Sequence, residues 1–124
     1  MTKPIAHTLI QATLIGEALD RGPAAIFVAD DDRRYLAVNE YACTLLGYTR
    51  EELLGLTVLD VAINPEAESD YAQMLASGFL TGVAKLRRKD GSELDIAYRA
   101  SETEVGTLRL FVSVCWPADE SQPL

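Results

Sequence analysis

The chain has 124 residues, with 11 Lys and Arg against 19 Asp and Glu, so its formal net charge is −8. This length corresponds to one domain, and a content of 48% hydrophobic and 24% charged residues is typical of a globular protein with its own core. The acidic balance argues against nucleic acid and anionic membrane surfaces as partners, because both need clustered Lys and Arg. No apolar run approaches the roughly 20 residues of a membrane span.

Residue types that carry chemistry are few. One histidine, His7, and two distant cysteines, Cys43 and Cys115, leave too few soft ligands for zinc and form no disulfide framework. His7 has no evident acidic partner and Cys43 has no nearby base in the sequence, so we expect no enzyme. The N-terminus lacks a secretion signal, and we therefore expect a cytoplasmic protein with reduced thiols.

Residues 5–20 have the spacing of an amphipathic helix. The glycine and proline of Arg21-Gly22-Pro23 end this helix. Its apolar stripe is wide, which leaves two interpretations open: the helix packs on its own domain, or it is shared with a partner subunit. The positions expected at a dimer interface are Ile5, Leu9, Ala12, Ile15 and Leu19.

The next segments predict a hairpin followed by several helices. Strands at residues 24–29 and 35–38 enclose a charged turn, the pattern of two strands joined in a β-hairpin. The helices that follow are expected at 40–46 behind the capping Asn39, between Thr49 and Gly55 with a Thr49/Glu52 capping box, at 58–62 and, longer, from Asn64-Pro65 to Gly78.

In the last third of the chain, apolar and polar residues alternate as they do in β-strands. Strands at residues 82–88 and 93–100 flank Asp90-Gly91, a strong hairpin signal. A loop at 101–106 then leads into a last strand at 107–116. This order predicts an α+β domain with one five-stranded antiparallel sheet, short helices over one face and a flanking N-terminal helix.

The order of the predicted strands and helices in residues 22–117, and the capping and turn residues between them, resemble the PAS domain family. The resemblance implies a cavity between sheet and helices that holds a ligand or cofactor in some members. It also implies sensing or dimerisation, as in bacterial two-component signalling, rather than catalysis. We divide the chain into an N-terminal amphipathic helix (1–22), a PAS core (23–117) and a polar tail (118–124). The segments that carry the resemblance are Ala25-Ile26-Phe27-Val28-Ala29-Asp30, Tyr35-Leu36-Ala37-Val38-Asn39, Leu45-Leu46-Gly47-Tyr48, Thr49-Arg50-Glu51-Glu52-Leu53-Leu54-Gly55 and Arg88-Lys89-Asp90-Gly91-Ser92.

The resemblance also bears on cofactors, whose identity stays unknown. Light-sensing flavin members carry a reactive cysteine that residues 58–66 lack, so no covalent flavin is expected. Haem-binding members most often use a histidine on the long helix, and none stands between Pro65 and Gly82, so no His-ligated haem is expected. A non-covalent flavin, a small apolar ligand and no ligand at all stay open.

Strand alternation and helix faces indicate which side chains would line the cavity. Apolar walls with two phenols suit a hydrophobic ligand oriented by one or two hydrogen bonds, although the same residues would also fill an ordinary core. The expected ligand-binding residues are Val28, Val38, Leu46, Tyr71, Leu75, Leu86, Ile96, Tyr98, Val112 and Val114.

Our hypothesis for signalling is a homodimer. Occupancy of the cavity would shift the N-terminal helix across Phe27, Ala37 and Phe111 on the outer face of the sheet, and so change the dimer geometry. Phe27 and Phe111 thereby complete the predicted dimer interface. The alternative is a ligand-free module for dimerisation or protein interaction, with an effector domain or a partner protein that the sequence does not identify.

Overall fold

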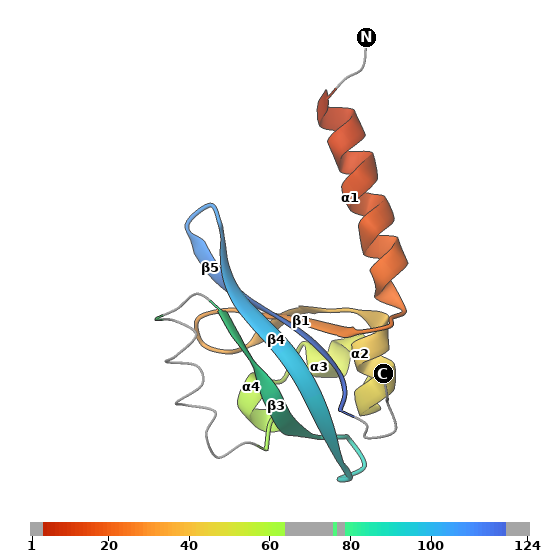
Figure 1. The fold of residues 1–124 in the computed structure, drawn as a ribbon, viewed down its shortest axis with the longest axis vertical. Helices are drawn as coiled ribbons and strands as arrows, with labels where there is room; N and C mark the ends of the chain where they lie inside the picture. Colours follow the sequence, from red (N-terminus) through yellow and green to blue (C-terminus); the bar gives the residue numbers. More distant parts are fainter. Residues whose placement is uncertain (1–3, 64–75, 77–78, 119–124) are drawn as a thin grey trace.

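The computed structural model describes residues 4–63, 76 and 79–118 (Figure 1). Its sheet has five strands in the order β2-β1-β5-β4-β3, and every neighbouring pair is antiparallel. The predicted α+β architecture is therefore confirmed, with short helices against one face of the sheet. The elements are α1 (Pro4–Asp20), β1 (Ala25–Ala29), β2 (Tyr35–Val38), α2 (Glu40–Leu46), α3 (Arg50–Leu53), α4 (Val58–Val61), β3 (Phe79–Arg87), β4 (Glu93–Val105) and β5 (Leu108–Pro117).

The predicted boundaries hold best where side chains cap a helix. The Asn39 side chain accepts a hydrogen bond from Ala42 N (3.0 Å) at the start of α2, and Gly47 ends that helix with φ 82°. Such a left-handed residue is strained for any side chain but easy for glycine. Thr49 and Glu52 form the expected capping box of α3. The expected long helix at 65–78 lies outside the described residues except for Ala76, which is helical.

Strands β3 and β4 are longer than expected. The predicted loop at 101–106 is instead strand up to Val105, and the chain turns at Gly106, whose φ is 65°. Glu102 pairs with Phe111 across the ladder, and its carboxylate lies 2.8 Å from Arg109 Nε. The polar residues of this segment thus stand on a twisted ribbon that projects past the neighbouring strands (Figure 1).

The faces of β1 and β5 were predicted the wrong way round. In β1 the buried residues are Ala25, Phe27 and Ala29, so the half-buried Ile26 and Val28 point to the opposite face. Because Phe27 pairs with Ser113 across the ladder, the same reversal applies throughout β5. Phe111 and Cys115 therefore join Phe27 on the helix-covered face, while Val112 and Val114 alternate to the outer face.

The main core lies between α2 to α4 and this inner face. Leu46, Leu53 and Val61, one from each helix, are all fully buried. Ala42 of α2 and Ala25 of β1 are also 0% exposed, because two residues without side chains beyond Cβ let the helix approach the strand closely.

Helix α1 stands away from the sheet, as Figure 1 shows. The expectation that it packs across Phe27 and Phe111 is wrong, because both side chains are only 5% exposed and lie on the inner face. Large apolar side chains of α1 are exposed instead: Ile10 (59%), Leu14 (62%), Ile15 (59%) and Leu19 (40%). None of the helices within the described ranges is both long and apolar enough to cross a membrane.

Candidate ligand cavity

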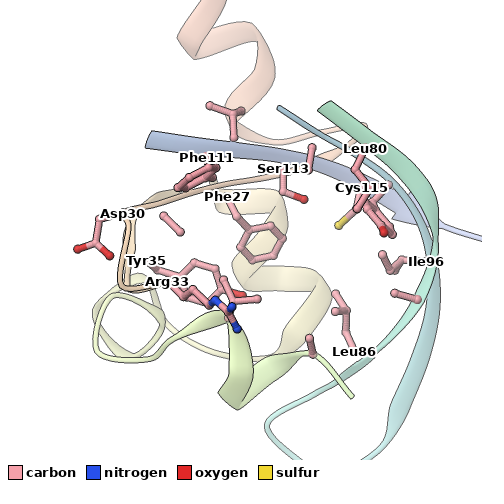
Figure 2. A pocket seen from close by; sticks show the side chains of 17 residues that line it. Phe27, Asp30, Arg33, Tyr35, Leu80, Leu86, Ile96, Phe111, Ser113 and Cys115 are labelled. Carbon is pink, nitrogen blue, oxygen red and sulfur yellow. The ribbon is translucent and has the colours of Figure 1, made fainter. Parts of the chain in front are cut away.

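A cavity of about 160 Å³ lies between the inner face of the sheet and the segment that runs from the β1–β2 turn to α4. Figure 2 shows the Phe27 ring in the middle of its lining, with Leu80 and Phe111 toward one end and Leu86 toward the other. The volume matches cavities of about 150 Å³ that accept a benzene-sized guest. The apolar residues that border the cavity are Phe27, Ala29, Tyr35, Val58, Ala62, Leu80, Ala84, Leu86, Ile96, Tyr98, Ala100, Phe111 and, through its backbone, Val112.

The cavity separates two groups of packed side chains. The main core includes Leu86 and Ile96, whereas Phe111 and Ala100 form a smaller cluster with Leu80. Alanines on β1, β3 and β4, together with Ala62 after α4, face the space between the two groups. Because an alanine side chain ends at Cβ, these positions leave a void that larger residues would fill.

Few polar groups face this space, and two of them are held neutral. Burial raises the pKa of the Tyr35 phenol well above its usual range. Burial also raises the pKa of the Cys115 thiol to about 12, so this sulfur is a weak donor rather than a nucleophilic thiolate. The Tyr98 phenol and the Ser113 hydroxyl complete a lining that can orient a ligand by hydrogen bonds. Within the described ranges, no three His, Cys, Asp or Glu side chains are grouped so that they could hold a metal ion.

One arginine, Arg33, reaches the cavity from the β1–β2 turn. Its φ is 66°, which makes it the one residue other than glycine with a positive φ among those described. Figure 2 shows the Arg33 guanidinium on the cavity side of the turn, whereas the Asp30 carboxylate points away from the cavity. The turn thus sends two neighbouring charges of opposite sign in opposite directions.

Four of the ten residues predicted to bind a ligand border the cavity: Leu86, Ile96, Tyr98 and Val112. Val38 and Leu46 are buried in the main core beside it, and Val28 and Val114 point to the outer face. Tyr71 and Leu75 lie outside the described residues. Whether any of these residues contacts a ligand stays a prediction.

The sequence reasoning missed the residues that dominate the lining. Phe27 and Phe111 were assigned to the outer face, and Tyr35 and Ser113 were not considered. A signal was present, since Phe27 has alanines two residues before and after it, so that on one face of β1 a large ring lies between small neighbours. Arg33 carried no signal, because its orientation depends on a backbone angle that the sequence does not display.

A single buried amide, that of Asn39, joins α1 to the core. Its Oδ1 accepts hydrogen bonds from Ile26 N (2.9 Å) and Ala42 N (3.0 Å). Its Nδ2 donates to Leu19 O (2.7 Å) and Ala24 O (3.0 Å). The end of α1, strand β1 and the start of α2 thus meet at the Asn39 side chain. Strand β1 is also the strand that carries Phe27.

A second contact holds the end of α1 from outside. The Asp20 carboxylate accepts hydrogen bonds from Glu40 N (2.9 Å) and from Arg50 Nη2 (3.1 Å). Arg50 in turn donates from Nε to Val38 O (3.2 Å). The last turn of α1 is therefore fixed to strand β2 and to the start of two helices, although the rest of α1 projects.

Comparison with known proteins identifies the family of the chain. The PAS domain family model matches residues 23–115. The chain belongs to the PAS domain family, a class of sensory and signalling domains. No curated protein sequence matches it.

Solved structures agree in fold. A PAS domain from a two-component sensor histidine kinase superposes with a TM-score of 0.79 at 18% identity, covering 89% of this chain and 98% of that one. The PAS domain of an HTR-like protein from Haloarcula marismortui gives 0.76 at 19% identity, covering 92% and 97%. An RNA-binding Light-Oxygen-Voltage receptor gives 0.78 at 21% identity, covering 98% of this chain but 37% of the receptor.

Proposed function

We propose that this PAS domain senses a small, mainly apolar ligand in the cavity around Phe27 and passes its occupancy to α1. The observation that carries the proposal is the cavity itself, about 160 Å³ of space between two packed clusters. Apolar walls with a few polar groups are the usual composition of a ligand site.

The route to α1 starts at β1. Phe27 lines the cavity, and its neighbour Ile26 donates its backbone N–H to Asn39, which also holds Leu19 O at the end of α1. A ligand that presses on Phe27 would bias the arrangement of this junction, and with it the direction of α1. A ligand can do so only by the difference in its affinity for the two arrangements.

Filling the cavity tests this proposal. The probe is 1-hexanol, titrated into ¹⁵N-labelled protein while the amide shifts of Ile96, Ser113 and Cys115 are followed. We expect saturable shifts in the wild type and at least about tenfold weaker binding in Ala84→Phe, whose ring would occupy the cavity. Ala84 lines the cavity from β3.

The matched control is Val83→Phe, which adds the same ring at the next residue of β3. Val83 is 71% exposed and points to the other face, so this variant should bind 1-hexanol as the wild type does. The proposal fails if 1-hexanol leaves the cavity amides of the wild-type protein unshifted, or if both variants weaken binding equally.

Helix α1 supports a second part of the proposal, a homodimer. Ile10, Leu14 and Ile15 expose more than half of their side chains on a helix that has no sheet beneath it. Exposed apolar side chains gathered on one element are typical of an interaction surface, and a second copy offers a self-complementary one. A module that dimerises through α1 without any ligand is the alternative function.

Sedimentation of the full chain tests the dimer. We expect a dimer whose dissociation constant rises at least about tenfold in Leu14→Glu, because a carboxylate would be buried against apolar side chains. Thr13→Glu adds the same charge about 100° around the helix from Leu14 and should weaken the dimer much less than Leu14→Glu does. A monomeric wild type, or equal weakening by both variants, would remove α1 as the interface.

A further inference from the structure

Arg33 has a backbone conformation that side chains rarely adopt. Its φ of 66° lies in the left-handed region, which costs about 1–2 kcal/mol for a residue with a Cβ atom. Strain of this kind persists where the surroundings hold it, and it gathers at ligand sites. The chain has an arginine where glycine or asparagine would be the relaxed choice.

The turn fixes this conformation from both sides. Arg33 N donates to Asp30 O (2.9 Å), and Val58 N at the start of α4 donates to Arg33 O (2.9 Å). The Asp30 carboxylate accepts from Asp32 N (2.9 Å) and from Arg34 N (3.0 Å), so the residues around Arg33 are pinned as well. The guanidinium is therefore presented by a backbone that cannot easily turn it away.

The two adjacent arginines have different surroundings. Arg34 lies 3.1 Å from the Asp30 carboxylate through Nε and 3.5 Å from Asp32 through Nη2, in exposed ion pairs. Partial burial of Asp30 acts to raise its pKa, but the hydrogen bonds and the charge of Arg34 outweigh this and lower it. Arg33 lines the cavity together with Asp30, and it is the one Lys or Arg among the described lining residues.

We infer that the ligand is a small monocarboxylate, with its carboxylate at Arg33 and a short apolar tail or ring among Phe27, Phe111 and Leu80. The inference rests on the proposed function of the cavity and adds the charge of its ligand. A guanidinium matches the two oxygens of a carboxylate through parallel N–H donors. The apolar walls exclude a second charged group, because burying it without a partner is costly.

The test compares three probes with the same six-carbon tail: hexanoate, 1-hexanol and hexylammonium. Binding to the full chain is followed through the amide shifts of Ser113 and Cys115. We expect hexanoate to bind at least about tenfold more tightly than 1-hexanol, and hexylammonium to bind most weakly. In Arg33→Gln, hexanoate should lose about tenfold in affinity while 1-hexanol stays within about twofold of the wild type.

Two variants control the experiment. Arg34→Gln removes the same charge one residue away, where the side chain pairs with Asp30 and Asp32, and should leave hexanoate binding unchanged. Arg33→Gly removes the guanidinium from a backbone that accepts a φ of 66° without strain, so it keeps the turn folded if the glutamine variant does not.

The outcomes separate the two proposals. If 1-hexanol binds the wild type as tightly as hexanoate, or if Arg33→Gln weakens both probes equally, the carboxylate inference is wrong and the cavity proposal stands. If none of the probes shifts the cavity amides, the proposed function itself fails. If Arg34→Gln weakens hexanoate as much as Arg33→Gln does, the effect is general charge attraction and the inference is overturned.

Discussion

Replacing Asn39 with alanine is expected to lower the free energy of unfolding by about 3 kcal/mol. The amide is 9% exposed and makes four hydrogen bonds, to Ile26 N, Ala42 N, Leu19 O and Ala24 O. Alanine removes the cap of α2 and leaves backbone groups of three separate segments without partners. Urea denaturation followed by circular dichroism measures the change.

Asn39→Ser is the matched control. A serine hydroxyl can still cap α2 by accepting from Ala42 N, but it is too short to replace the bonds to Leu19 O and Ala24 O. We expect it to recover about 1 kcal/mol relative to alanine. A loss below about 1 kcal/mol in Asn39→Ala would show that water replaces the amide, and that this junction does not hold α1.

The second large effect concerns Phe27. Phe27→Ala should cost about 3–4 kcal/mol, because it removes a buried ring, only 5% exposed, from the wall of the cavity. Ile26→Ala changes the preceding residue, which is half-buried on the outer face, and should cost about 1 kcal/mol. Thermal and urea unfolding of the two variants measure the difference.

Which of Phe27→Ala and Ile26→Ala lowers the free energy of unfolding more shows which face of β1 the helices cover. If Ile26→Ala were more destabilising than Phe27→Ala, the inner face would be the one first expected from the sequence. The reversal would extend to β5, because Phe27 pairs with Ser113 and the two strands share their faces.

Local signals predicted much of the fold. Asn39, Gly47 and the Thr49/Glu52 capping box placed α2 and α3 correctly, because capping depends on atoms within a few residues of each other. Asp90-Gly91 placed the β3–β4 hairpin in the same way. These features need no knowledge of the rest of the molecule.

The faces of β1 and β5 could not be predicted in this way. Both strands have apolar residues on each side, so alternation alone does not say which side the helices cover. The packing of α2 against β1 decides it, and these elements are distant in the sequence, since the buried Ala25 and Ala42 are 17 residues apart. Most of the cavity lining was missed for this reason.

The ribbon at the end of β4 was missed for a different reason. Ser101 to Val105 include four polar residues in a row before the valine, which is typical of a loop. The strand continues because its partner residues in β5 follow one another without a gap, from Phe111 back to Leu108. Pairing of this kind is a property of two strands together.

The alanines of the cavity have a thermodynamic consequence. These alanines leave room for a guest. A guest present at about 100 times its dissociation constant would stabilise the folded domain by about 2.7 kcal/mol, a sizeable share of the stability of a small domain. How often this domain unfolds, and how long it survives proteolysis, would then track the concentration of its ligand, as a second readout that needs no movement of α1.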